Sequence, residues 1–126
     1  MSKSLDDLCA DVRFKAEDLI RMAISEYGFN PVVVDTMRTE QEQAQNVKQG
    51  TSKTVKSLHL KQPCCGKSHA IDIAPRHLMK MKNWAPKHPD WEKLGLLGER
   101  IGLQWGGRWK RFRDCPHFYK EGKCSP

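Results

Sequence analysis

No run of apolar residues in this 126-residue chain approaches the roughly 20 residues that a helix needs to span a bilayer. The first ten residues include Asp6 and Asp7 and contain no apolar stretch, so they do not resemble a secretory signal peptide. We therefore expect a protein that is made in the cytoplasm and has no membrane span. Internal repeats and low-complexity segments are also absent, and the length fits one domain with a modest core.

Acidic residues are outnumbered by basic ones, 15 against 22, which gives a formal net charge of +7. A basic surface attracts polyanions, among them nucleic acids and the anionic polymers of cell walls. The sequence contains no helix-turn-helix signature, no zinc-finger spacing and no aromatic RNA-binding motif. Charge alone therefore supports the alternative of a nucleic-acid-binding protein.

Cysteine occurs five times, an odd number, and no Cys-x-x-Cys pair is present. Without a secretion signal, such a set predicts free thiols rather than a disulfide framework. Cys64 and Cys65 are adjacent, which disfavours their binding one structural zinc ion together. We therefore expect no structural zinc site built on cysteine.

Hydrophobic periodicity predicts a first helix over residues 5–27, which can contain a break, and a third over 90–101, and a capping-box pattern predicts a second helix over 39–50. A glycine directly after the first and the third helix is a typical stop signal. The second helix begins with the capping-box pattern Thr-Glu-Gln-Glu, and Asp90 is expected to cap the third.

Strands are predicted over residues 31–34, 68–73, 103–105 and 118–119, and a frayed tail over 122–126. The order of helices and strands predicts an α+β fold, in which a small antiparallel sheet carries the functional site and helices flank it.

Histidines outside the candidate site are expected to have ordinary roles. Alternation along the strand 68–73 places Asp72 beside small residues on one face, and His69 on the opposite face. His69 is thus a poor partner for Asp72, and we expect a partly buried, hydrogen-bonded histidine. His77 and His88 lie among lysines and prolines and are expected in exposed loops.

Three short segments contain what a hydrolytic zinc site requires: Ser57-Leu58-His59, Ala70-Ile71-Asp72 and Asp114-Cys115-Pro116-His117. Two histidines and one carboxylate hold zinc and leave a fourth position for water, the arrangement that separates catalytic from structural zinc. Zinc makes such a water nucleophilic near neutral pH. Asp114, three residues before the last histidine, is a spare carboxylate.

In this order, the segments resemble the zinc peptidases that cut peptidoglycan stem peptides: D-alanyl-D-alanine carboxypeptidases, dipeptidases and phage L-alanyl-D-glutamate endopeptidases. Arg38 in segment 36–43 and the run 102–107 before the last segment match as well, so the resemblance spans nearly the whole chain. It implies a single domain over residues 1–126 with the hedgehog and D-Ala-D-Ala peptidase type of fold.

The resemblance also implies roles for the site residues. His59, Asp72 and His117 would bind Zn²⁺. Asp114 would be the general base, which takes a proton from the attacking water and passes it to the leaving amine; the alternative is a carboxylate that orients a histidine.

Two further residues take roles from the same resemblance. Arg38 would hold the substrate carbonyl and stabilise the developing oxyanion, although a surface charge or a pair with Glu40 remains an alternative. Ser57 would bind substrate or hydrogen-bond within the site. The sequence departs from the family pattern at residues 60–67, which lengthen the connection after His59 and are expected to form a loop.

The sequence thus predicts a monomeric zinc peptidase that resembles a compact phage endolysin, cuts the L-Ala–D-Glu bond of the peptidoglycan stem peptide and stays in the host cytoplasm until released to the wall, for example through a holin. A D-Ala–D-Ala carboxypeptidase is the alternative within the class. A basic nucleic-acid-binding protein and a non-catalytic zinc module are the alternatives outside it. Anionic wall polymers are possible partners because of the positive charge.

Overall fold

The computed structural model describes residues 2–50, 57–81, 84–111 and 113–122. In chain order the elements are η1 (Leu5–Asp7), α1 (Ala10–Tyr27), β1 (Pro31–Asp35), α2 (Glu40–Lys48), β2 (Ala70–Pro75), α3 (Arg76–Met79), α4 (Pro89–Arg100), β3 (Gln104–Trp105), η3 (Gly106–Arg108) and β4 (His117–Tyr119). Within these ranges, no helix has the length and apolarity needed to cross a membrane.

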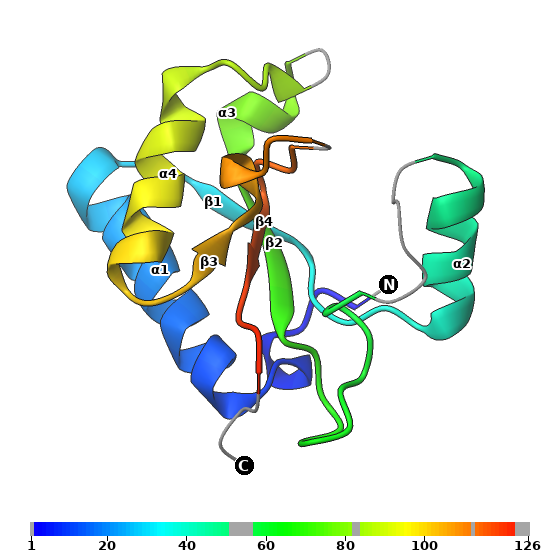
Figure 1. Ribbon diagram of the computed structural model, residues 1–126. Coiled ribbons are helices and arrows are strands. Elements are labelled where there is room, and N and C mark those ends of the chain that lie inside the picture. Colours follow the sequence, from blue (N-terminus) through cyan, green and yellow to red (C-terminus); the bar gives the residue numbers. More distant parts are fainter. Residues whose placement is uncertain (1, 51–56, 82–83, 112, 123–126) are drawn as a thin grey trace.

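The four strands form one antiparallel sheet in the order β1-β2-β4-β3. Helices α1 and α4 pack against each other on one side of this sheet, while α2 stands apart on the other side (Figure 1). Strand β2 lies in the middle and is buried along its whole length. The sheet with flanking helices is the predicted α+β arrangement.

Helix α1 contributes one apolar stripe to the core, in which Val12, Ala16, Leu19 and Ala23 are all fully buried. Their spacing of three and four residues is that of one helix face. The helix ends at Gly28, whose left-handed conformation (φ 64°) favours glycine. The predicted helix is confirmed from Ala10 onward, whereas the preceding turn is the separate 3₁₀ helix η1.

Helix α4 approaches the sheet closely because two of its buried residues are glycines. A Cβ atom at Gly95 would lie 2.4 Å from the Trp105 ring, and one at Gly98 would lie 2.4 Å from the Phe118 ring. Contacts under 3.0 Å leave no room for a methyl group, so the rings of β3 and β4 rest directly on the helix backbone. This packing fixes β4, the strand that begins with His117.

Two sequence predictions near α4 are wrong in detail. The helix begins at Pro89, and its N-cap is His88, whose Nδ1 accepts a hydrogen bond from the backbone of Asp90. His88 is therefore a half-buried cap and not an exposed loop residue, and Asp90 lies inside the first turn. His77 is exposed as expected, but it lies in the short helix α3, which the sequence did not predict, and it contacts Asp90.

The cysteine prediction is confirmed in part. Cys64, Cys65 and Cys115 are free thiols. Cys9, the buried N-cap residue of α1, is disulfide-bonded, contrary to the prediction. The predicted tail beyond Gly122 lies outside the described residues.

Candidate metal centre

The register of the sheet brings three polar residues together at its middle. Asp72 of β2 lies opposite Asp35 of β1 on one side and opposite His117 of β4 on the other. An extra residue in β1, between Val33 and Asp35, produces the register shift that sets Asp35 beside Asp72. Directly opposed residues of antiparallel strands point to the same face. Pairing alone therefore places Asp72 and His117 side by side.

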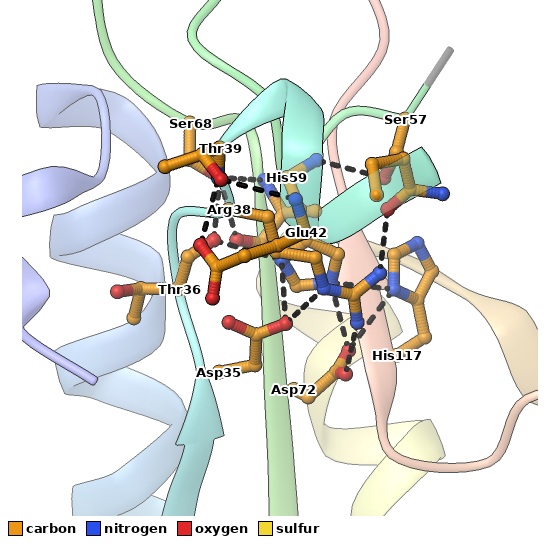
Figure 2. A network of polar contacts seen from close by, with 12 residues as sticks. Asp35, Thr36, Arg38, Thr39, Glu42, Ser57, His59, Ser68, Asp72 and His117 are labelled. Atoms are coloured by element: carbon orange, nitrogen blue, oxygen red, sulfur yellow. Dashed lines mark hydrogen bonds and ion pairs between the residues drawn. The ribbon is translucent and has the colours of Figure 1, made fainter. Parts of the chain in front are cut away.

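His59 reaches the same point from the loop that precedes β2. Two backbone hydrogen bonds hold this loop: Arg38 N donates to His59 O at 2.9 Å, and His69 N donates to Leu58 O at 2.8 Å. The Ser57 hydroxyl accepts a hydrogen bond from the His59 backbone N–H at 3.1 Å (Figure 2). Ser57 thus positions the histidine through its backbone.

Three ligand-type atoms converge at this site (Figure 2). His59 Nε2 lies 3.0 Å from Asp72 Oδ1 and 3.2 Å from His117 Nδ1, and the latter lies 3.0 Å from the same oxygen. All three side chains are buried, with exposures of 1%, 7% and 8%. Two ligands of a tetrahedral zinc ion with bonds of about 2.0–2.2 Å lie roughly 3.3–3.5 Å apart. The donor set and its spacing therefore fit a zinc ion.

The hydrogen bonding of His59 prepares it for a ligand role. Its Nδ1 lies 2.7 Å from the carbonyl oxygen of Thr36, and since a carbonyl only accepts, Nδ1 carries the proton. The lone pair of Nε2 is then directed at Asp72 and His117. Metal-binding histidines commonly donate their other N–H to a carbonyl in this way, which fixes the tautomer and the ring orientation.

Aromatic rings hold His117 from the other side. The rings of Trp109 and Tyr119 lie 5.2 Å from the His117 ring, and Trp109 Nε1 donates to the Tyr119 hydroxyl at 3.1 Å. The backbone of Gly106 lies against the turn that contains Asp114 and leads into His117. A Cβ atom at Gly106 would lie 2.6 Å from the Asp114 carbonyl oxygen and 3.1 Å from His117 Cβ, so a larger residue would not fit there.

Arg38 lies against the cluster, with only 15% of its side chain exposed. Its Nε donates to Asp35, its Nη1 to Gln43 at 2.9 Å and its Nη2 to Asp72 Oδ2 at 3.4 Å. The alternative of a free surface charge, or of a pair with Glu40, does not describe this arrangement. These three contacts fix the guanidinium beside Asp72, and an arginine has five N–H donors in all.

The cluster is electrostatically coupled. Burial alone would raise the pKa of Asp72, but without a metal ion a protonated His59, which then carries a proton on Nε2 as well, and hydrogen bonds from His117 and His59 outweigh it, so the pKa falls below its usual range. Burial would lower the pKa of His59, but Asp72 and Asp35 raise it on balance. Burial raises the pKa of Asp35 despite His59 and Arg38. The carboxylate of Asp72 thus stays ionised in a buried site that attracts a cation.

Asp114 lies beside the three-atom cluster without joining it. Burial, with a smaller contribution from the charge of Asp72, raises the pKa of Asp114 to about 6. The residue also lines a surface cavity of about 280 Å³, together with Trp84, Pro86, Trp91, Arg113, Cys115 and Pro116. A carboxyl group with this pKa, at the edge of a cavity, is suited to exchange protons near neutral pH.

A titration tests the environment of Asp114. In metal-free protein, NMR of the side-chain carboxyl carbons should give Asp114 a midpoint near 6, because desolvation favours the protonated form. Added zinc should lower this midpoint, since a nearby cation favours the carboxylate. Asp90 is the internal control: burial would raise its pKa, but hydrogen bonding and charge from His77, His88 and Lys93 outweigh burial and lower it. An Asp114 midpoint near 4 without metal would show that its carboxyl group is in water.

Sequence reasoning missed the residues that support the site. Asp35, Thr36 and Gln43 hold Arg38 and His59, and Trp109 packs on His117. One signal was present: an aspartate closes the apolar strand β1 three residues before the arginine, where a buried ion pair is expected. Nothing local marks the other three.

Comparison with known proteins agrees with the predicted family. The profile of the D-alanyl-D-alanine carboxypeptidase family of peptidases matches residues 49–120, more than half of the chain. The chain therefore belongs to this family. The match includes His59, Asp72, Asp114 and His117.

Among curated proteins, the chain is 32% identical over 91 residues to the L-alanyl-D-glutamate peptidase of Listeria phage A118, covering 71% of this chain and 30% of the phage protein. It is 29% identical over 112 residues to the peptidoglycan L-alanyl-D-glutamate endopeptidase CwlK of Bacillus subtilis, covering 79% of this chain and 66% of CwlK. The chain thus spans less than a third of the first relative and about two thirds of the second.

Among solved structures, the L-Ala D-Glu endopeptidase ChiX of Serratia marcescens matches with a TM-score of 0.66 at 22% identity, over 93% of this chain and 83% of that one. The likeness confirms the predicted fold class, with its small antiparallel sheet and flanking helices.

Proposed function

We propose that this chain is a zinc peptidase that hydrolyses the L-Ala–D-Glu amide bond of peptidoglycan stem peptides. The observation that carries the proposal is the buried convergence of His59 Nε2, Asp72 Oδ1 and His117 Nδ1 within 3.2 Å of one another. The names of the phage and Bacillus relatives support the choice of bond. Family membership favours this function over nucleic-acid binding, which only the charge supports.

His59, Asp72 and His117 would hold the metal ion. When bound, zinc supplies a Lewis acid for the scissile carbonyl and makes water nucleophilic near neutral pH. Asp114 accepts the proton of the attacking water and later donates it to the leaving amine, for which a pKa of about 6 is well placed. Arg38, fixed by Asp35 and Gln43, offers N–H donors to the developing oxyanion.

Ser57 and the cavity beside Asp114 support this chemistry without taking part in it. Ser57 holds the backbone of His59 and therefore acts on the substrate only indirectly. The cavity between Trp84 and Asp114 offers an apolar wall and the cation of Arg113, a surface that suits a peptide with a carboxylate. We propose it as part of the stem-peptide groove.

The function is tested by digestion of purified peptidoglycan followed by mass spectrometry of the products. New N-terminal D-Glu and C-terminal L-Ala should appear, and a chelator should prevent both. Release of free D-alanine instead would identify the carboxypeptidase alternative. No new termini with the zinc-loaded protein would refute a peptidase, and this is the outcome that a non-catalytic zinc module predicts.

Arg38→Lys should lower kcat about 10²–10³-fold, the usual effect of a lost oxyanion donor. Lysine keeps the charge, but its single ammonium cannot reproduce the contacts to Asp35, Gln43 and Asp72 together. KM should change little if the arginine acts mainly in the transition state. Steady-state kinetics on a soluble stem peptide measures both, with Arg100→Lys as the exposed control. An unchanged kcat in Arg38→Ala would exclude the role.

We also propose that the positive charge holds this enzyme on anionic wall polymers. Binding to sacculi should then weaken as salt shortens the Debye length from about 8 Å near 0.15 M to about 3 Å near 1 M. Co-sedimentation at rising salt measures it, and hydrolysis of a small stem peptide is the control, which should fall much less. A parallel fall of both would mean that salt acts on the site or the fold.

The likeness to a phage peptidase supports a role in lysis. We propose that residues 1–126 act as one monomeric peptidase domain that cuts the wall of the bacterial host once it leaves the cytoplasm. An elution volume of a dimer in size-exclusion chromatography would contradict the monomer.

A further inference from the structure

A second set of side chains of metal-ligating types lies near the start of β2, separate from the set that contains Asp72. His69 directly precedes β2 and is 2% exposed. Its Nε2 lies 3.3 Å from Cys64 Sγ and 3.3 Å from Cys65 Sγ. The sulfur of Cys9 lies near two of these atoms, because the ligand atoms of Cys9, Cys65 and His69 are all within 4.8 Å of one another.

The spacing of these atoms is close to that of a zinc site. With Zn–S bonds of about 2.3 Å and Zn–N bonds of about 2.0–2.1 Å, a sulfur and a nitrogen on one tetrahedral ion lie roughly 3.6 Å apart. Both observed sulfur–nitrogen distances are within a few tenths of an ångström of this value. Thiolate and imidazole are also the ligands that structural zinc sites use.

The turn after Gln62 explains how two adjacent cysteines face one imidazole. Gln62 O accepts from Gly66 N at 2.8 Å, Gln62 N donates to Lys67 O at 3.0 Å, and Gly66 adopts a left-handed conformation (φ 69°). The chain therefore reverses directly after Cys65. Both thiols therefore face the His69 ring, although they are adjacent in the sequence.

We propose that Cys64, Cys65 and His69 bind a structural zinc ion that is separate from the one at His59, Asp72 and His117, with Cys9 as fourth ligand when its disulfide is reduced. A dithiol reductant would supply the two electrons and two protons that convert that disulfide to two thiols, and would itself become a disulfide. Zinc binding then releases the protons of the ligating thiols.

The site would fasten the loop that carries His59. Residues 60–67 leave His59 and return to β2 at Ser68, whose carbonyl accepts from Cys9 N at 2.9 Å, while His69 N donates to Leu58 O at 2.8 Å. An ion at this place joins the start of α1, the loop and the start of β2. Residues 60–67 would thus form a loop that the bound ion ties to α1 and β2.

Cobalt substitution tests the proposal on residues 1–126, reduced with a dithiol that is then removed. Co²⁺ bound by thiolates gives an intense near-ultraviolet charge-transfer absorption, which a site of two histidines and an aspartate does not give. Wild type loaded with Co²⁺ should show this absorption, and wild type loaded with zinc should retain about two zinc ions per chain. The Cys64→Ser/Cys65→Ser double variant should lose the absorption and one zinc ion, and Cys115→Ala, the matched free-thiol control, should keep both.

The outcome is independent of the proposed catalytic centre. His59→Ala should keep the charge-transfer absorption while it loses one zinc ion, so that failure of either site is seen separately. A wild-type protein without the absorption, or a double variant that still holds two zinc ions, would overturn the proposal. If the double variant fails to fold by circular dichroism, His69→Gln serves as the second test, with the same expected loss.

Discussion

His117→Ala should lose about 10³-fold or more in peptidoglycan hydrolysis and should retain one zinc ion fewer than the wild type. The side chain supplies one of three converging ligand atoms, at 3.0 and 3.2 Å from the other two. The Lewis acid is worth several kcal/mol of transition-state stabilisation, and each 1.36 kcal/mol is about tenfold in rate. Elemental analysis and a turnover assay on the same samples measure both effects, and His59→Ala should behave alike.

His77→Ala is the matched control, since this exposed histidine contacts Asp90 and lies outside the cluster. It should keep its metal and its rate. The two ligand variants should also lose the stabilisation that zinc gives the wild type in thermal melts, because an ion bound only by the folded state adds stability. Full zinc retention in both His59→Ala and His117→Ala would refute the assignment of these ligands.

Asp114→Ala should reduce turnover by about 10²–10⁴-fold, the contribution expected of a general base, while zinc content stays that of the wild type. The reason is its position: its pKa is raised to about 6 by burial beside the cluster, yet it supplies none of the three converging atoms. Kinetics and elemental analysis on purified protein separate the two effects. Asp114→Asn, which keeps the shape but not the basicity, should be equally slow.

The controls separate chemistry from structure. Asp90→Asn alters another partly buried aspartate away from the cluster and should leave the rate unchanged. If Asp114→Ala loses its metal, the residue is a ligand and the roles of Asp114 and Asp72 must be exchanged. If it keeps both metal and rate, the proton is carried by another group.

The local parts of the fold could be predicted because they depend on neighbours in sequence. The stripe of α1 and the capping box of α2 are set within one or two turns, and the structure contains both, including the reciprocal bonds of Thr39 and Glu42. The short helix α3 was missed because four residues carry no periodic signal. The cap by His88 was missed because histidine is an unusual N-cap, and Asp90 is of a preferred type.

The candidate site could be predicted as a set of residues but not as an arrangement. Alternation over residues 68–73 predicted that Asp72 and His69 are no partners, and the two have different neighbours, His59 and His117 for Asp72 and the thiols of Cys64 and Cys65 for His69. The order of the motifs singled out His59 and His117, 58 residues apart. The contacts that hold these residues could not be predicted. His59 bonds to the Thr36 carbonyl and Asp35 pairs with Asp72, and both contacts join residues far apart in the sequence, which leaves no local pattern. The meeting of Cys64, Cys65 and His69 was missed for a similar reason, as it depends on a turn.

Anomalous diffraction at the zinc absorption edge tests the central claim most directly. Crystals of residues 1–126 grown with zinc should show an anomalous peak bonded to His59 Nε2, Asp72 Oδ1 and His117 Nδ1 at about 2.0–2.2 Å, with Asp114 close by and not bonded to it. A zinc-soaked crystal with these three side chains in place and no peak between them would contradict the account.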